Sequence, residues 1–370
     1  MPENSAAWLT GKAQRLEVRT APYTAPADNE IVIKNNAIAT NPVDYIIGDM
    51  GGPGGMMYQW LKFPFVVGVD VAGEVVEVGP GVTRFKIGDR VIGHSAGTEK
   101  EYNTTAKSAF QLYTVLQSHM TSPIPSTMSY EDACVLPLCL STAACGLFQK
   151  DQLGLEYPTV TPKSTGKTLL IWGGSTSVGS NAIQLAVAAG YEVFTTASPR
   201  NFDYVKKLGA SKVFDYKSKT TIQELIRAFE GKTTAGALSI GPGAANACMD
   251  ILATCKGNKF LSMVTYPNPD PMPTSFVVPK FIFTFMTWSI AQFYKSVTRS
   301  IGYKFIWGGT LIDNGLGKYI YEDFLPEALA QGTYLTAPEP IVAGNGLEHV
   351  QTALDLLRKG VSAKKVIVTL

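Results

Sequence analysis

Residues 173–179 are the part of this chain whose types and spacing best fit a chemical role. They read GGSTSVG, after the apolar run Leu169–Trp172 and before the stretch Asn181–Ala189. This order is typical of a strand, a tight glycine turn and a helix. The unpaired backbone N–H groups of the first helical turn then face the space beyond the end of the strand. Small residues there let phosphates approach the backbone. The segment predicts a cradle for a nucleotide pyrophosphate, although its spacing is not the strict G-x-G-x-x-G.

The segment that follows indicates which nucleotide fits. We expect a second strand over Tyr191–Ala197 and, after Ser198-Pro199-Arg200-Asn201, a helix over 202–208. NAD-binding chains usually place an acidic residue at the end of this strand, where it accepts from the ribose hydroxyls. Here Ser198, Arg200 and Asn201 offer a hydroxyl, a guanidinium and an amide, which suit a 2′-phosphate. The pattern favours NADP(H); the alternative is that Ser198 or Asn201 caps the helix and Arg200 points into water.

Length and charge exclude several other classes of protein. The chain has 370 residues, enough for two domains, and 32 basic residues against 30 acidic ones, without a basic run that could follow a nucleic-acid backbone. Its polar start, Met1–Ser5, is not a secretory signal. We expect a cytoplasmic protein that binds neither nucleic acid nor a membrane.

The cysteines predict no disulfide framework. There are five, an odd number without a paired spacing: Cys134, Cys139, Cys145, Cys248 and Cys255. Reduced, buried thiols are the simplest interpretation. A catalytic thiol would need a neighbouring histidine, and none of His94, His119 and His349 is adjacent in sequence.

The two ends of the chain have a different sequence pattern from its middle, one typical of short strands. Glu30–Lys34, Gly73–Gly79 and Gly88–Gly93 have the pattern of short half-buried strands. Strand patterns return at Ile341–Val342 and Lys365–Val368, with a helical pattern between them. The C-terminal strands could complete a β-rich first domain, which would make the nucleotide-binding unit an insertion.

Four segments, taken together, resemble the medium-chain dehydrogenase/reductase superfamily over nearly the whole chain. They are Asn41–Tyr45, Gly68–Val75, Gly88–Val91 and Gly173–Gly179. The resemblance implies an α/β fold with a GroES-like β-rich catalytic domain over 1–135, a Rossmann domain over 136–310 and a completing part over 311–370. Residues 136–143, 198–203 and the apolar stretch near Phe281 are most similar to the zinc-free branch, in particular the trans-acting enoyl reductases of fungal polyketide synthases of the lovastatin-pathway type.

The residues themselves argue against a catalytic zinc. Asn41 stands where the resemblance would place the first cysteine ligand, and Val69-Asp70 replaces a His-Glu pair. No group of four cysteines follows Gly93. His94 is expected to be a satisfied residue at a strand end. We therefore expect no metal site.

Without a metal, the reaction that fits is hydride delivery to the β-carbon of an alkene conjugated to a thioester or ketone, with protonation at the α-carbon. One or two hydrogen bonds must then stabilise the developing enolate. Tyr45 is the candidate donor to the carbonyl or source of the proton, which water could also supply. Thr142 and Ser141 are further candidate carbonyl donors, with helix capping as the alternative role.

The resemblance implies the remaining site residues. Cofactor contacts are expected at Pro42, Val43, Asp44, Tyr45, Ser175, Thr176, Ser177, Val178, Ser198, Pro199, Arg200, Asn201, Tyr216, Met263, Val264, Val361 and Ser362. Substrate contacts are expected at Leu136, Pro137, Leu138, Cys139, Leu140, Ser141, Phe281, Phe283 and Phe285. Met263 and Val264 could equally be core residues, since apolar strand ends usually are.

Two apolar segments have open interpretations. Phe276–Phe293 is too short and interrupted to span a membrane, and is either a buried or interface helix or the wall of a tunnel for a linear acyl chain. The glycine-rich segment 51–55 could be a mobile loop over the site or an ordinary surface loop.

The sequence predicts an NADPH-dependent trans-acting enoyl reductase for an α,β-unsaturated polyketide acyl thioester, presented by the carrier domain of a synthase. The resemblance favours a monomer. A quinone or enone reductase is the alternative enzyme, and a non-catalytic NADPH-binding protein is the alternative from another class.

Overall fold

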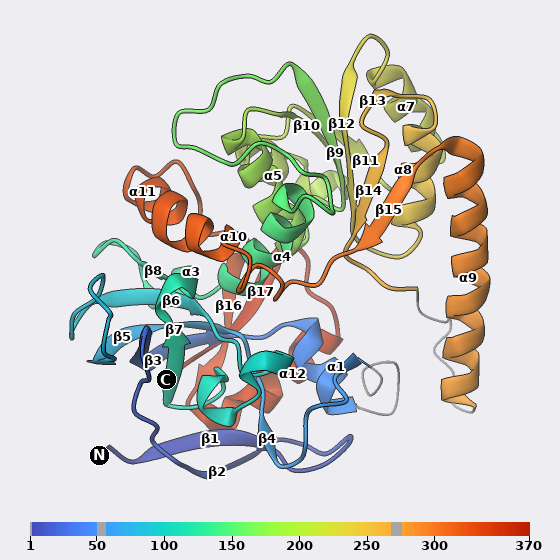
Figure 1. Ribbon diagram of the computed structural model, residues 1–370. Coiled ribbons are helices and arrows are strands. Elements are labelled where there is room, and N and C mark those ends of the chain that lie inside the picture. The colour runs from blue at the N-terminus through green and yellow to red at the C-terminus, as the bar shows by residue number, and fades with distance from the viewer. Residues whose placement is uncertain (1, 50–56, 268–275) are drawn as a thin grey trace. The chain divides into compact units, whose positions relative to one another are not determined.

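The computed structural model describes residues 2–49, 57–267 and 276–370, without the side chains of Val277 and Val278. The chain forms two compact units (Figure 1). Met1–Leu138 and Gly317–Leu370 form the first unit, and Cys139–Leu316 form the second. The second unit is thus a continuous insertion into the first, as the strand patterns at the two chain ends predict.

The first unit is built on a seven-stranded, mainly antiparallel sheet in the order β16-β17-β3-β5-β6-β8, with β7 paired to β3. Its strands are β3 (Glu30–Ala39), β5 (Asp70–Val78), β6 (Arg90–His94), β7 (Tyr113–Gln117), β8 (Thr121–Pro123), β16 (Glu339–Asn345) and β17 (Lys364–Thr369). A second sheet has the order β2-β1-β4, formed by β1 (Asn4–Leu9), β2 (Glu17–Ala21) and β4 (Phe65–Val66). Because β17 pairs with β3, the end of the chain completes a sheet that its start begins.

Short helical segments connect these strands. The α-helices are α1 (Pro42–Asp49), α3 (Tyr130–Ala133), α10 (Leu316–Lys318), α11 (Leu325–Ala330) and α12 (Val350–Arg358). The tighter or wider turns are η1 (Lys100–Tyr102), η2 (Thr105–Lys107), η3 (Ser118–Met120), η5 (Tyr319–Phe324) and η6 (Leu347–His349). Helices α1 and α12 contact each other, so the segments that follow β3 and precede β17 are neighbours.

The second unit is a parallel sheet in the order β11-β10-β9-β12-β14-β15, with β13 beside β12. Its strands are β9 (Lys167–Trp172), β10 (Glu192–Ala197), β11 (Lys212–Asp215), β12 (Thr233–Ser239), β13 (Lys256–Gly257), β14 (Phe260–Met263) and β15 (Gly302–Phe305). Its helical elements are α4 (Pro137–Phe148, which starts at the boundary), α5 (Ser177–Ala188), η4 (Pro199–Asn201), α6 (Phe202–Lys207), α7 (Thr221–Ala228), α8 (Ala244–Leu252) and α9 (Val277–Arg299). The strand order reverses at β9, and ligands of such sheets bind beyond the carboxyl ends of the strands at this point.

Three elements differ in extent from the sequence-based expectation. Helix α5 starts at Ser177 rather than near Asn181, because Thr176 caps it. Strand β3 continues past Lys34 to Ala39, because Ala37, Ile38 and Ala39 pair with β5 on one side and with β17 on the other. The apolar segment noted over Phe276–Phe293 belongs to one helix, α9, which extends over 23 residues to Arg299.

Burial in the protein interior explains one apolar helical stretch. Within the described residues, Tyr130–Phe148 is long and apolar enough to cross a membrane, and 78% of the relevant window is buried inside the protein. The core helix of a globular protein gives the same pattern.

Candidate functional site

The glycine turn after β9 has no room for side chains. Gly173 has φ +91°, a region that L side chains rarely adopt. A Cβ on Gly174 would come within 2.1 Å of Thr195 Oγ1, and one on Gly179 within 2.2 Å of the Gly173 carbonyl oxygen. The glycines therefore let α5 start directly against the end of β9.

Thr176 organises the start of α5. Its hydroxyl accepts from the Gly179 N–H at 3.0 Å and donates to the Gly173 carbonyl at 2.8 Å. Ser177 and Val178 are the first two residues of the helix, and their N–H groups have no acceptor in the described part of the chain. Two unpaired donors at the positive end of a helix dipole fit a phosphate. The Thr176 side chain itself is used for capping.

The end of β10 is tied to this turn by Thr196. The Gly173 N–H donates to Thr196 Oγ1 at 3.0 Å, and the Gly174 N–H donates to the Thr196 carbonyl at 2.9 Å. The residues that follow, Ser198–Asn201, are thereby placed next to the turn. The sequence did not single out Thr196, whose signal is a hydroxyl within a buried strand.

The structure argues against the capping alternative for the segment after β10. Neither Ser198 nor Asn201 makes a side-chain capping hydrogen bond to the helical segments that they precede. Arg200 is exposed, and no ion pair of its guanidinium is found in the described residues. This arginine is thus available to a bound anion.

The other predicted cofactor residues of the second unit lie at the same edge of the sheet. Tyr216 follows β11 and is 44% exposed, while Val264 follows β14 and donates its N–H to the Ser239 carbonyl at 3.0 Å. The Met263 side chain is buried in the core beneath this edge. Since all these strands are parallel, their carboxyl ends share one edge, where the turn residues are also found.

The remaining predicted cofactor residues belong to the first unit. Pro42–Tyr45 start α1, and Val361 and Ser362 lie between α12 and β17. The Arg358 guanidinium of α12 lies 4.5 Å from the centre of the Tyr45 ring and binds Asp49 of α1 with two hydrogen bonds of 2.7 Å. Partial burial raises the pKa of Tyr45 above its usual value, against the effect of Arg358. A tyrosine hydroxyl is protonated at neutral pH even at its ordinary pKa, so Tyr45 can donate.

A buried polar cluster occupies the centre of the first unit. The Lys365 ammonium lies 2.8 Å from Asp70 Oδ2 and 2.5 Å from Asn41 Oδ1, and the Asn41 amide donates to Asp70 Oδ2 at 2.9 Å. The Asp70 and Lys365 side chains are 0% and 3% exposed. The other carboxylate oxygen, Oδ1, accepts from the Leu138 N–H at 2.5 Å, at the end of the first unit.

Two further buried groups in this region have shifted pKa values. Burial raises the pKa of Asp44 to about 8, reinforced by the charge of Asp70 and opposed by the Asn41 N–H, which donates to Asp44 Oδ2 at 2.7 Å. Burial lowers the pKa of His94 to about 4, so this histidine at the end of β6 is neutral at pH 7. The expected satisfied histidine is confirmed, because it also bonds the Pro137 backbone.

These residues do not fit a catalytic zinc ion. Zinc prefers thiolate, neutral imidazole and carboxylate ligands. At Asn41 and Asp70 the structure instead provides an amide, a carboxylate and the Lys365 cation, which already neutralises that carboxylate. Over the described ranges, no three His, Cys, Asp or Glu residues are grouped so as to hold a metal ion.

The five cysteines are free and buried, as their spacing predicted. Burial raises the pKa of the thiols of Cys134, Cys248 and Cys255. A raised pKa keeps a thiol protonated and weakly nucleophilic.

The predicted substrate residues around α4 are mostly buried. Leu136, Leu140 and Ser141 are 0% exposed, and Leu138 is half-buried. Thr142, the second candidate donor, packs against Gly308, where an added Cβ would lie 2.5 Å from Thr142 Oγ1. This tight contact limits the positions open to the hydroxyl.

The three predicted substrate residues on α9 differ in exposure. Phe281 is 7% exposed, whereas Phe283 and Phe285 are 70% and 44% exposed. The interpretation of α9 as a buried helix is therefore wrong for one of its faces.

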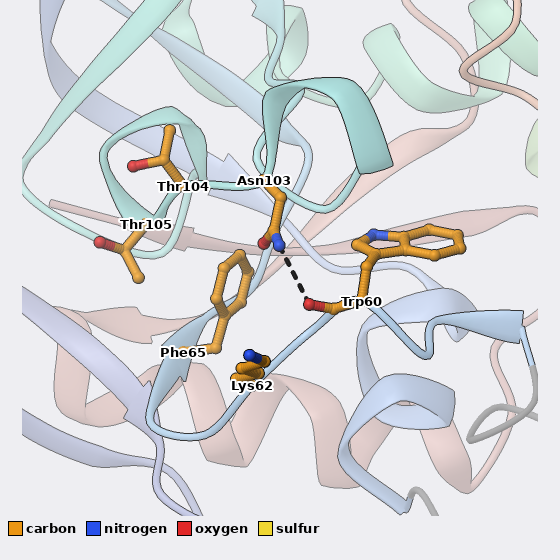
Figure 2. Close-up of a pocket in the computed structure, with 6 residues that line it drawn as sticks. All are labelled: Trp60, Lys62, Phe65, Asn103, Thr104 and Thr105. Atoms are coloured by element: carbon orange, nitrogen blue, oxygen red, sulfur yellow. Dashed lines mark hydrogen bonds between the residues drawn. The ribbon is translucent and has the colours of Figure 1, made fainter.

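A groove in the first unit was not anticipated from the sequence. It measures about 560 Å³ and is lined by Trp60, Lys62, Phe65, Asn103, Thr104 and Thr105. Figure 2 shows the Asn103 amide donating to the Trp60 carbonyl, at 3.0 Å. None of the predicted site residues lines this groove. The glycine-rich segment 51–55, a candidate loop over the site, lies outside the described residues.

Comparison with known proteins agrees with this architecture. Residues 27–126 match the alcohol dehydrogenase GroES-like domain, and residues 177–280 match the zinc-binding dehydrogenase family. The chain is 53% identical to dehydrogenase pigH of Monascus ruber over the full length of both, and 37% identical to trans-enoyl reductase himH of Aspergillus japonicus, covering 99% of this chain and 97% of that one. An alcohol dehydrogenase superfamily structure from Novosphingobium aromaticivorans shares the fold (TM-score 0.75, 22% identity, 99% of each chain). The chain belongs to the medium-chain dehydrogenase/reductase family of oxidoreductases.

Proposed function

We propose that this protein is an NADPH-dependent trans-acting enoyl reductase that reduces an α,β-unsaturated acyl thioester in polyketide biosynthesis. The observation that carries the proposal is the edge of the parallel sheet, where two unpaired N–H groups of α5 and the available Arg200 are adjacent. The family uses a nicotinamide cofactor. Relatives named trans-enoyl reductases, such as himH at 37% identity, support the reaction.

The choice of NADPH over NADH depends on the residues after β10. Ser198, Arg200 and Asn201 offer donors to a phosphate, and no acidic residue is present there to accept from ribose hydroxyls. A guanidinium without an ion-pair partner can form a charge-assisted pair with the 2′-phosphate.

The bound cofactor would supply the hydride for the β-carbon of the substrate. The chain must then stabilise the negative charge that develops on the thioester oxygen and allow protonation at the α-carbon. Tyr45, whose hydroxyl is protonated at neutral pH, can donate to this oxygen, and Thr142 is the second candidate donor. The proton can come from Tyr45 or from water.

The test is the consumption of NADPH with an α,β-unsaturated acyl thioester of pantetheine, beside parallel reactions with NADH and with a simple quinone. We expect thioester reduction with NADPH strongly preferred. Reduction of the quinone alone would instead assign the chain to quinone reductases. NADPH binding without turnover of either acceptor would contradict the proposal and favour a non-catalytic binding protein.

A further inference from the structure

The carboxylate of Asp70 holds two separate segments of the chain at once. Its Oδ2 accepts from the Asn41 amide at 2.9 Å, and its Oδ1 accepts from the Leu138 N–H at 2.5 Å. Asn41 directly precedes α1, which carries Tyr45, and Leu138 is the second residue of α4. One buried side chain at the start of β5 therefore bridges the starts of two helices.

The bond to Leu138 caps α4 from outside the helix. The first N–H groups of a helix have no acceptor within it, and a negative charge near them is favourable because of the helix dipole. The preceding residue is held as well, because the Pro137 carbonyl accepts from the buried Tyr321 hydroxyl at 2.9 Å and from His94. Side chains of β5, β6 and η5 thus fix the first turn of α4.

Lys365 allows the Asp70 carboxylate to be buried as an anion. A carboxylate away from water stays ionised only when a cation or several hydrogen-bond donors compensate for the lost hydration. The Lys365 ammonium lies 2.8 Å from Asp70 Oδ2 and also donates to Asn41 Oδ1. Lys365 is in β17, three residues after Ser362, an expected cofactor contact. The ion pair therefore ties a third segment of the first unit to the same point.

The two helices joined at Asp70 carry the candidate donors of the proposed reaction. Tyr45 is in the first turn of α1, and Ser141 and Thr142 follow Leu138 by three and four positions in α4. A shift of the first turn of either helix moves its donor with it. Displacing a reacting group by ~1 Å can lower a rate roughly a hundredfold. Both oxygens of Asp70 are used within the buried cluster, so this residue acts through the two helices.

Asn41 and Asp70 occupy positions where the resemblance would place ligands of a catalytic zinc ion, yet here they bind each other and Lys365. We propose that Asp70, neutralised by Lys365, is a positioning residue that holds the starts of α1 and α4 so that their donors reach the substrate carbonyl. This role rests on the proposed function for the reaction that it serves.

The experiment compares two double variants of the full-length chain, both of which remove the buried ion pair. Asp70→Leu/Lys365→Met fills the space with apolar groups and removes both hydrogen bonds of the carboxylate. Asp70→Asn/Lys365→Met keeps an oxygen that can accept from the Leu138 N–H. The Asn41 amide, released from Lys365, can then turn its oxygen toward the new NH₂ group. The two variants thus differ in whether the bridge is retained.

A matched control removes another largely buried ion pair of the first unit. Glu30 and Lys107 lie 2.6 Å apart, with side chains 9% and 20% exposed. Glu30 starts β3, whereas Asn41 follows the other end of this strand. Glu30→Leu/Lys107→Met therefore tests whether the loss of any buried ion pair affects the reaction.

We expect Asp70→Leu/Lys365→Met to lower kcat with the unsaturated pantetheine thioester about ten- to hundredfold. Its Kd for NADPH should be almost unchanged, because the nucleotide edge belongs to the second unit. Hydrogen exchange of the peptide 136–148, followed by mass spectrometry, should become faster. Asp70→Asn/Lys365→Met and the control should keep the native exchange rate in this peptide and most of the native kcat.

Native kcat or native exchange in Asp70→Leu/Lys365→Met would overturn the positioning role. Equal losses of kcat in both double variants would also overturn it, because the charge of the pair and not its hydrogen bonds would then matter. A similar loss in the Glu30→Leu/Lys107→Met control would assign the effect to reduced stability.

Two further arrangements keep the test decisive. If circular dichroism shows that Asp70→Leu/Lys365→Met does not fold, Asp70→Ser/Lys365→Met takes its place, because water can fill the space left by the shorter side chain without fixing either helix. A native chain that reduces no thioester would refute the proposed function instead. The exchange comparison needs no turnover and would still decide whether Asp70 holds α4.

Discussion

Arg200 is the single residue on which the proposed choice of cofactor depends most. It is exposed after β10, and no ion pair of its side chain is found in the residues described. A hydrogen bond to a charged group contributes ~1.5–3 kcal/mol. Arg200→Ala should therefore weaken NADPH binding roughly ten- to hundredfold and leave NADH binding almost unchanged, which fluorescence titration can measure.

The control for Arg200 is Arg227→Ala, which removes another exposed arginine of the same unit, on α7. This variant should bind both nucleotides like the native chain. Equal losses of NADPH and NADH affinity in Arg200→Ala would contradict a 2′-phosphate contact and indicate a contact to the pyrophosphate shared by both.

Asp44 should make the protein less stable as the pH rises. Burial gives it a folded-state pKa of about 8 against an ordinary value of 3.8, so between these values the unfolded chain is ionised while the folded chain retains the proton. Removing the ionisable group with Asp44→Asn should raise the free energy of unfolding by an amount that grows from about pH 4 to about pH 8. Urea denaturation of both proteins at each pH measures this difference.

His94 gives the free energy of unfolding a pH dependence of opposite sign. This contribution cancels when Asp44→Asn is compared with the native chain, because both proteins contain His94. Its folded-state pKa of about 4 lies below its ordinary 6.5, so stability is lost as the pH falls through this range. A difference between Asp44→Asn and the native chain that does not change with pH would contradict a raised pKa at Asp44.

At the scale of elements, the start of α5 depends on Gly179. A Cβ there would lie 2.2 Å from the Gly173 carbonyl oxygen. This oxygen belongs to the backbone, which cannot move aside as the end of a flexible side chain can. Gly179→Ala should push α5 away from β9, lower the free energy of unfolding by ~1–3 kcal/mol and weaken nucleotide binding. Thermal unfolding followed by circular dichroism, with and without NADPH, measures both effects.

The matched substitution is Gly48→Ala on α1, where the nearest atom to the added Cβ is Leu9 Cδ1 at 3.7 Å. Alanine there should be neutral or slightly stabilising, because glycine costs a helix about 1 kcal/mol relative to alanine. If both variants lost the same stability, the close approach at Gly179 would not be the cause.

The elements of the nucleotide edge were predictable because their signals are local. A buried strand, a glycine turn and a helix follow one another within residues 167–188, and the parallel order brings the later strand ends to the same edge. The exposed face of α9 was not predictable in this way. Its richness in apolar residues indicates a buried helix, and only the packing of Gln292 and Lys295 on α8 decides which face is covered.

At the scale of the whole molecule, the buried cluster of the first unit joins the two ends of the chain. Lys365 and Asn41 are 324 positions apart, yet their side chains bond at 2.5 Å beside Asp70. No pattern in the sequence connects residues at this distance, so the sequence predicts only a strand at this lysine. Its pairing depends on β17 lying against β3.

This pairing predicts different costs for two adjacent lysines. Lys365→Met would leave the Asp70 carboxylate buried without its cation, which typically costs about 3–5 kcal/mol of the free energy of unfolding. Lys364→Met removes only the ion pair between Lys364 and Glu339, whose side chains are 35% and 72% exposed. It should lower the free energy of unfolding by less than about 1 kcal/mol. Urea denaturation measures both. Adding Asp70→Asn to Lys365→Met removes the unpaired charge and should recover part of the loss; if it recovers none, the loss comes from packing around Lys365 and not from charge.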